Sequence, residues 1–232
     1  AAGLQGILQA VIAIPQSILQ RAVGVQAFGE YLLDPAWSGV SIISDGTTRF
    51  LRAYGLSDHP NILGGCLAFS LLVLLTVYLR GERKNSLLLG IAYVLISLAL
   101  LMTFSRSAWL AFAAGGIFIV WFEARARGWA FNKSLALLFI CTAFVLLPFI
   151  AANSNYFGAR FNAGNSFEAV RTERGAVQER LFLIESANHI FSKYPLTGVG
   201  MSASPLALRN EIPRLPETYN YQPPHFTLLT VG

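Results

Sequence analysis

The stretch that decides the fold is Ser86–Phe104, SLLLGIAYVLISLALLMTF, which contains no Asp, Glu, Lys or Arg. An apolar helix of about 18 residues is about 27 Å long, close to the hydrocarbon thickness of a bilayer. Three other runs also lack charged residues: Ile62–Leu79, Ala108–Phe122 and Ser134–Ala152. The sequence therefore predicts four transmembrane helices within residues 61–152, the third of them short.

The composition of the whole chain agrees with a membrane location. Of its 232 residues, 54% are hydrophobic and only 12% are charged, whereas soluble domains carry about 25% charged residues. This composition excludes a disordered chain, a collagen and a coiled coil. The net charge of +5 does not indicate a nucleic-acid partner, because the basic residues are sparse and lie between apolar runs.

Residues 1–28 form a fifth candidate span with a polar face. Four glutamines recur at helical spacing on this face: Gln5, Gln9, Gln16 and Gln20. Pro15 is expected to kink the helix. We expect a spanning helix whose glutamines face other helices or a cavity, and an amphipathic helix on the membrane surface is the alternative.

The distribution of basic residues predicts the orientation. The short loops 80–85 and 123–133 hold six of the 17 Lys and Arg residues, and the positive-inside rule places such loops in the cytoplasm. The outer loop 29–60, the hairpin 105–107 and the loop 153–224 then face the periplasm. The predicted fold class is an all-α polytopic membrane protein, a bundle of transmembrane helices with a long, partly helical periplasmic loop.

The sequence at both ends of the chain suggests that it was taken from a longer protein. No basic segment precedes an apolar core at Ala1, so we expect no signal peptide there. Residues 225–232 begin an apolar run that stops early and are interpreted as the start of a truncated transmembrane helix. We expect the sequence to be a central piece of a longer polytopic protein.

Three residues of the outer segments are candidates for chemistry. Arg106 lies in a tight hairpin at the outer boundary, where it could bind a phosphate or simply reach lipid headgroups. Arg180 lies on a helix expected over residues 172–193, which could equally be a solvated surface helix. His225 follows two prolines, and histidine is a suitable general base near neutral pH, although a lone histidine is more often structural.

Other parts of the outer segments carry no predicted helix. Residues 153–170 are rich in Asn, Gly and Ser and are interpreted as a loop, and five prolines after Gly200 predict irregular structure. The chain has no glycine-rich phosphate loop and no cluster with metal-ligand spacing. Any phosphate chemistry would therefore rely on arginines in place of Mg²⁺.

Four motifs, in order, resemble those of the O-antigen ligase and polymerase superfamily. Arg52–Gly64 (RAYGLSDHPNILG) resembles its G-x-x-x-x-PN-x-x-G stretch, and Thr103–Trp109 (TFSRSAW) resembles its T-x-SR hairpin. The segment from Arg180 through Pro195–Gly200 (PLTGVG) is similar to its R-x-x-x-W and P-L-x-GVG motifs, and Pro224–Phe226 to its HN motif. Two positions depart from the pattern: Ile184 replaces Trp, and Phe226 replaces Asn.

The resemblance implies a bacterial inner-membrane glycosyltransferase of lipopolysaccharide or polysaccharide biosynthesis, active on the periplasmic face. Such an enzyme moves a glycan from undecaprenyl pyrophosphate to an acceptor hydroxyl on a glycan, lipid A-core or a protein. It implies no nucleotide sugar, no metal and no cofactor. His225 would be the base, and Arg106 and Arg180 would bind the pyrophosphate. The secondary candidates for substrate contacts are Arg49, Arg52, Arg160, Trp109 and Tyr219.

Two other functional classes remain open on the sequence. A coupled transporter usually carries ionisable groups inside its spans, and the four charge-free runs argue against one, but a lipid-linked glycan flippase stays possible. A non-enzymatic membrane scaffold with a partner-binding loop is the second alternative. It predicts that His225 and the outer arginines can be replaced without loss of function.

Overall fold

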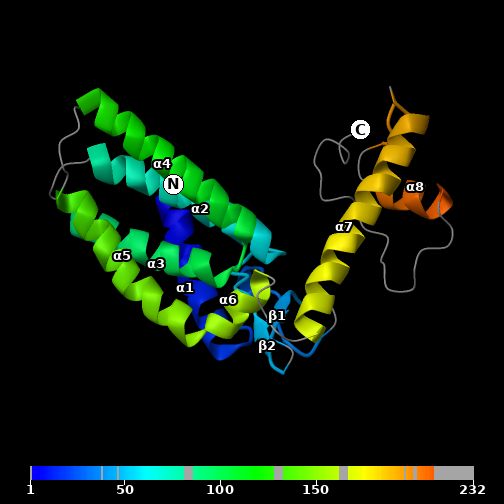
Figure 1. Cartoon of the computed structure of the whole chain (residues 1–232), viewed down its shortest axis with the longest axis horizontal. Helices are drawn as coiled ribbons and strands as arrows, with labels where there is room; N and C mark the ends of the chain where they lie inside the picture. Colours follow the sequence, from blue (N-terminus) through cyan, green and yellow to red (C-terminus); the bar gives the residue numbers. More distant parts are fainter. Residues whose placement is uncertain are drawn as a thin grey trace. The chain divides into compact units, whose positions relative to one another are not determined.

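The computed structural model describes residues 2–37, 39–45, 47–80, 86–127, 133–161, 167–195, 197–200 and 203–211. Figure 1 shows the course of the chain. It divides into two units, residues 1–169 and residues 170–232, and each unit is described by itself.

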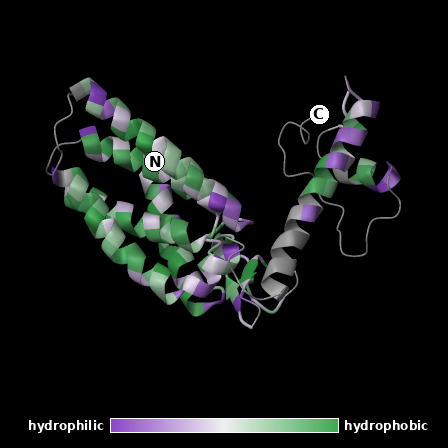
Figure 2. Cartoon of the chain, in the orientation of Figure 1, coloured by the Kyte–Doolittle hydropathy of each residue, from purple (hydrophilic) through white to green (hydrophobic). Residues whose placement is uncertain are grey.

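The first unit is a bundle of apolar helices. Its helices are α1 (Ala2–Leu19), α2 (Pro60–Arg80), α3 (Ser86–Met102), α4 (Arg106–Arg127) and α5 (Lys133–Ala152). All but α3 are long and apolar enough to cross a membrane by length and composition, and α3 is an apolar helix of 17 residues. Hydrophobic residues dominate these helices and polar ones gather near their ends (Figure 2). The predicted all-α polytopic membrane fold is confirmed.

Helix α3 lies at the centre of the bundle. It packs against α1, α2 and α5, while α2 also packs against α1 and α4. Glycines allow these close approaches, because a Cβ at Gly6 would lie 2.7 Å from Ser70 Cβ and one at Gly64 would lie 2.9 Å from Ala108 Cβ. Small residues at helix contacts are characteristic of membrane bundles, where packing replaces the hydrophobic effect.

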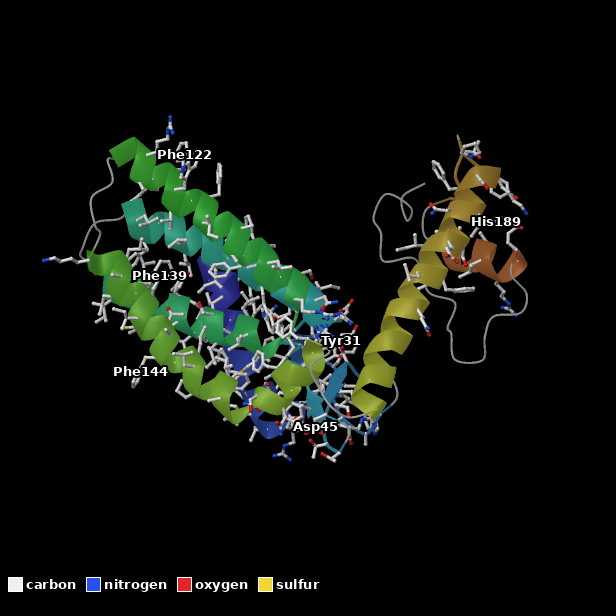
Figure 3. All side chains as sticks on the ribbon, viewed as in Figure 1. Tyr31, Asp45, Phe122, Phe139, Phe144 and His189 are labelled. Carbon is white, nitrogen blue, oxygen red and sulfur yellow. The ribbon has the colours of Figure 1, made fainter. Side chains whose placement is uncertain are left out.

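The outer surface of the bundle carries many large apolar side chains. Large side chains project from it, including Phe122, Phe139 and Phe144 (Figure 3). Phe144 is 79% exposed and Ile117 is 71% exposed. A continuous exposed apolar surface of this kind is stable only against lipid or other protein, which agrees with a membrane location.

Helix α1 is shorter than the helix expected over residues 1–28. It continues through Pro15 and ends at Leu19. Gln20 adopts a left-handed conformation (φ 55°), and its amide contacts the backbone of Ser17 and Leu51. This polar side chain therefore turns back to the outer loop, and the helix stops there. A short 3-10 helix, η1 (Gln26–Phe28), follows.

A small polar cap covers one end of the bundle. Strands β1 (Ile42–Ser44) and β2 (Arg49–Leu51) pair antiparallel, with Ile43 opposite Phe50. Helix α6 (Ser154–Arg160) packs against β1. The expected loop over residues 153–170 was therefore wrong for α6, because the aromatic rings of Tyr156 and Phe157 pack inward against Phe50 and Phe104.

Two further helices lie in the chain after residue 166. Helix α7 (Phe167–Lys193) starts before the helix expected over 172–193, and α8 (Ser204–Glu211) follows it. Leu183, Ile190 and Leu208 form a small core, which Lys193 supports by an ion pair with Glu211. The expectation of irregular structure after Gly200 was wrong for α8, since a proline at the second residue of a helix, as here, is compatible with helix formation.

Candidate functional site

The turn between α3 and α4, residues 103–105, is held by two of the predicted site arginines. Arg52 Nε donates to the Thr103 carbonyl at 2.7 Å, and Arg160 Nε donates to the Phe104 carbonyl at 3.0 Å. The last carbonyls of a helix lack partners within the helix, and an unpaired one is costly at membrane depth. Two arginines distant in sequence therefore complete the hairpin.

Neighbouring carbonyls of the turn are paired as well. Met102 O accepts from the Ala53 backbone N–H at 3.0 Å. Leu100 O accepts from the Thr103 hydroxyl at 2.6 Å and from the Trp109 indole N–H at 3.1 Å. The hairpin is thus fixed by backbone, hydroxyl and indole donors in addition to the arginines.

Phe104, at the tip of this turn, is strained and buried. Its φ is 48°, which is unusual for a bulky residue, and its side chain is fully buried. Four aromatic rings surround it: Phe50, Trp109, Phe149 and Phe157. Such conformations cost about 1–3 kcal/mol and persist only where the surroundings fix them, often at functional sites.

Arg52 acts as a brace rather than as an exposed cation. It is only 4% exposed. Besides Thr103, its guanidinium donates to Ser41 Oγ at 2.9 Å and to Asn61 Oδ1 at 2.7 Å. It therefore links the β1–β2 segment, the start of α2 and the α3–α4 hairpin.

His59 and Asn61 belong to this arrangement, and neither was among the site residues predicted from the sequence. Asn61 accepts a hydrogen bond from Arg52, and its backbone N–H donates to His59 Nδ1 at 3.1 Å. Both residues belong to the HPN part of the quoted motif, but the motif alone does not show that Asn61 binds Arg52.

Arg106 is the first residue of α4 and is half-buried. Its Nη1 donates to the Arg160 carbonyl at 2.8 Å. The positive end of the α4 dipole adds to the charge of its guanidinium. Arg52, Arg106 and Arg160 are thus brought together around one turn, at the end of the bundle that carries the polar cap.

Two glutamines of α1, Gln9 and Gln16, bind the outer loop, whereas Gln5 is exposed. Gln16 is fully buried; its Nε2 donates to Glu30 at 2.8 Å and to the Gly55 carbonyl at 3.0 Å, and its Oε1 accepts from the Gly55 N–H at 2.7 Å. Gln9 Oε1 accepts from the Leu56 N–H at 2.8 Å. The predicted polar face therefore contacts the extended segment 51–56, which contains Arg52.

Two carboxylates of the cap have lowered pKa values. Burial opposes ionisation of Glu30, but hydrogen bonds from Gln16 and from the backbone N–H groups of residues 23–25 outweigh it and lower its pKa. The backbone N–H groups of Thr48 and then Thr47 lower the pKa of Asp45 to about 2. Both groups hold loops through these hydrogen bonds, and the lowered pKa makes each carboxylate a weaker base.

Two of the other predicted substrate contacts lie in the described cap. Arg49 is exposed on β2, where its Nη1 lies 3.4 Å from the Ala36 carbonyl. Trp109 is half-buried and its ring stacks on Phe157, with centroids 5.8 Å apart. Trp109 thus has a packing role in the hairpin, and Arg49 is open to solvent.

The remaining candidates cannot be joined to this cluster. The backbone of Arg180 belongs to α7, and its side chain lies outside the described part of the chain. Tyr219 and His225 lie outside the described residues. Their roles stay predictions.

The chemical groups that this cluster offers are the guanidiniums of its three arginines. A guanidinium offers planar N–H donors that match phosphate oxygens. Arg52 and Arg160 are turned to the backbone and keep the turn rigid, and Arg106 stands at its edge on a helix start. A cation positioned on a rigid turn needs little reorganisation to bind a charged group.

Comparison with known families identifies the family of the chain. The sequence profile of the family described as O-antigen ligase matches residues 91–232, more than half of the chain, including the α3–α4 hairpin. Comparisons with curated proteins and with solved structures gave no significant match. The chain therefore belongs to the O-antigen ligase family.

Proposed function

We propose that the protein transfers a glycan from undecaprenyl pyrophosphate to an acceptor hydroxyl. Membership of the O-antigen ligase family supports a membrane glycan-transfer function. The single observation that supports a pyrophosphate-linked donor is the geometry of the turn at Thr103–Arg106. The carbonyls of this turn are hydrogen-bonded, and Arg106 lies at the start of a helix. This rigid cation suits the pyrophosphate of a lipid carrier at the membrane boundary.

The proposed reaction is a substitution at the anomeric carbon of the donor sugar. His225 takes the proton of the acceptor hydroxyl, whose oxygen bonds to the anomeric carbon. The bond between that carbon and the pyrophosphate oxygen breaks, and its electron pair leaves with the pyrophosphate. Arg106 and Arg180 stabilise the charge that the leaving group gains.

The proposed orientation places the turn on the periplasmic face of a bacterial inner membrane. The basic loops at the other end of the bundle support this orientation through the positive-inside rule. The acceptor is a growing glycan, lipid A-core or a protein hydroxyl. Residues of the loop 153–224 would select among them.

The test is a transfer assay in membranes with a defined undecaprenyl-pyrophosphate glycan and each acceptor class. We expect His225→Ala and Arg180→Ala each to abolish transfer, by about 10²-fold or more, while membrane insertion stays normal. Arg21→Ala, which removes an exposed cation beyond the end of α1, is the matched control and should retain activity. Full transfer by the His225 or Arg180 variant would refute the assigned role, and transfer by neither wild type nor control would favour a flippase or a scaffold.

A further inference from the structure

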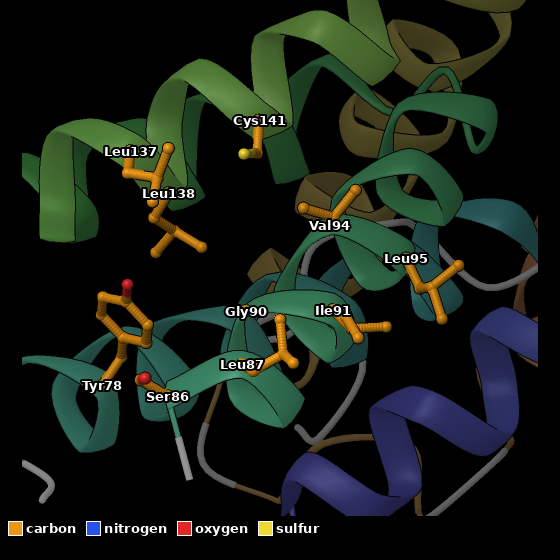
Figure 4. A pocket seen from close by; sticks show the side chains of 10 residues that line it. All are labelled: Tyr78, Ser86, Leu87, Gly90, Ile91, Val94, Leu95, Leu137, Leu138 and Cys141. Carbon is orange, nitrogen blue, oxygen red and sulfur yellow. The ribbon is translucent and has the colours of Figure 1, made fainter. Parts of the chain in front are cut away.

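An apolar groove lies at the other end of the bundle from the hairpin. It has a volume of about 360 Å³ and runs between α3 and α5, with Tyr78 of α2 at one side (Figure 4). Its lining is almost entirely hydrocarbon: Tyr78, Ser86, Leu87, Gly90, Ile91, Val94, Leu95, Leu137, Leu138 and Cys141. Gly90 widens it, because a Cβ there would meet only Leu138 Cδ1, at 3.8 Å.

The position of the groove separates it from the candidate site. Its α3 residues lie between Ser86 and Leu95, and Leu95 precedes Thr103 by roughly 12 Å of helix rise. The groove is therefore nearer to the start of α3 and the start of α5, in the opposite half of the bundle from the α3–α4 hairpin. A molecule in this groove reaches it from the leaflet on that side.

One exposed basic residue lies one helical turn from the lining of the groove. Lys133 is exposed, begins α5 and lies one helical turn before Leu137, which lines the groove. Arg80 follows Tyr78 by two residues, but its guanidinium is paired with Glu123, so Lys133 is the cation that we consider for a ligand. An apolar slot beside a cation is complementary to a molecule with a long hydrocarbon chain and an anionic head.

We propose that this groove binds an acyl chain of an anionic phospholipid, with the lipid phosphate near Lys133. The hydrocarbon chain fills the space between α3 and α5, and the head group stays at the membrane surface beside Lys133. This lipid would fix the packing of α5, which contacts α3 in the bundle. Only 11% of residues 135–152, the apolar part of α5, are buried by the protein itself. The proposal does not depend on the transfer reaction.

The first experiment fills the groove. Gly90→Leu places a side chain into it, and Gly65→Leu is the matched control, because Gly65 lies on exposed α2 surface with nothing within 4 Å of a Cβ. Each full-chain variant is reconstituted in vesicles of phosphatidylglycerol and phosphatidylethanolamine, and retained lipid is counted by native mass spectrometry. We expect Gly90→Leu to weaken phosphatidylglycerol retention about tenfold, equivalent to about two methylenes no longer buried. Equal retention by the two variants would overturn the proposal.

The second experiment removes the cation. Lys133→Gln should retain phospholipid but lose its preference for phosphatidylglycerol over phosphatidylethanolamine. Arg21→Gln, which removes an exposed cation beyond the end of α1, should keep the preference. An unchanged preference in Lys133→Gln would remove the anionic head group from the proposal.

A third measurement identifies the occupant directly. Photo-leucine at Leu95, which lines the groove and is 36% exposed, is activated in native membranes, and the adduct is identified by mass. We expect a phospholipid adduct. A polyisoprenyl adduct, or a crosslink to another segment of the chain, would overturn the assignment, and a second copy of the protein would do the same.

Discussion

The two ends of the bundle differ in how tightly their helices are joined. At the α3–α4 end, a tight turn is held by donors that come from the outer loop and from α6, and Phe104 stays buried in a strained conformation. At the α2–α3 end, the described polar contacts include the pair between Arg80 and Glu123, and an apolar groove opens between helices. The rigid polar end is where we propose that the glycan donor binds, and the apolar groove is where we propose that a phospholipid binds.

The strongest test of this contrast is the brace at the rigid end. Arg52→Met leaves Thr103 O, Asn61 Oδ1 and Ser41 Oγ without their guanidinium partner. We expect a loss of about 3–5 kcal/mol in the free energy of unfolding, measured by thermal or denaturant unfolding in detergent. Arg49→Met makes the same change at an exposed position of β2 and should cost less than about 0.5 kcal/mol. Similar losses in both variants would show that Arg52 is not a brace.

The second test separates two glutamines of one helix. Gln16→Leu removes two donated and two accepted hydrogen bonds at a fully buried position, and we expect about 2–4 kcal/mol of destabilisation. Gln5→Leu changes an exposed residue of α1 and should be neutral or slightly stabilising in a bilayer. The same unfolding measurement compares them, and a harmless Gln16→Leu would contradict the role of this face in holding the loop.

The third test concerns the segment that the glutamines hold. Gly55 has φ 59°, and a Cβ there would lie 2.3 Å from Gln9 Oε1. Gly55→Ala should therefore cost about 1–3 kcal/mol. Gly24→Ala is the control, because Gly24 also has positive φ (97°) but has nothing within 4 Å of a Cβ. A larger loss at Gly24 would mean that the contact with Gln9 is unimportant.

The smallest expected effect is a pH dependence of the stability of the β1–β2 turn. Hydrogen bonds from Thr48 and Thr47 lower the pKa of Asp45 from 3.8 to about 2. A lowered pKa in the folded state gives stabilisation that is present above pH 3.8 and is lost as the pH falls through about 2. Hydrogen exchange of residues 42–51, corrected for intrinsic rates, should show this loss in the wild type and its absence in Asp45→Ala. Asp58→Ala should behave like the wild type.

Much of the bundle could be predicted from the sequence, because charge-free runs and helical periodicity are local properties. The runs at Ile62–Leu79 and Ser134–Ala152 lie within α2 and α5. The glutamine face of α1 was visible for the same reason. Its partner was not, since the contact between Gln16 and Gly55 joins residues 39 positions apart.

The candidate site was predictable only in part. The TFSRSAW hairpin was recognised from its pattern, but the roles of its neighbours were not. Arg52 and Arg160 were expected to bind substrate, and the structure turns both to backbone carbonyls more than 50 residues away in sequence. Helix α6 was missed because its stability comes from aromatic packing against Phe104 and Phe50, which composition alone does not reveal.

The most direct test of the central claim is cysteine labelling at the two ends of the bundle. Ser107→Cys, exposed beside Arg106, and Lys133→Cys, exposed at the start of α5, are made after Cys66 and Cys141 are replaced by Ala. In sealed right-side-out vesicles, we expect a membrane-impermeant maleimide to modify Ser107→Cys only, and undecaprenyl-pyrophosphate glycan to protect it. Modification of Lys133→Cys instead, or labelling of Ser107→Cys that the donor does not slow, would contradict a donor site at the hairpin.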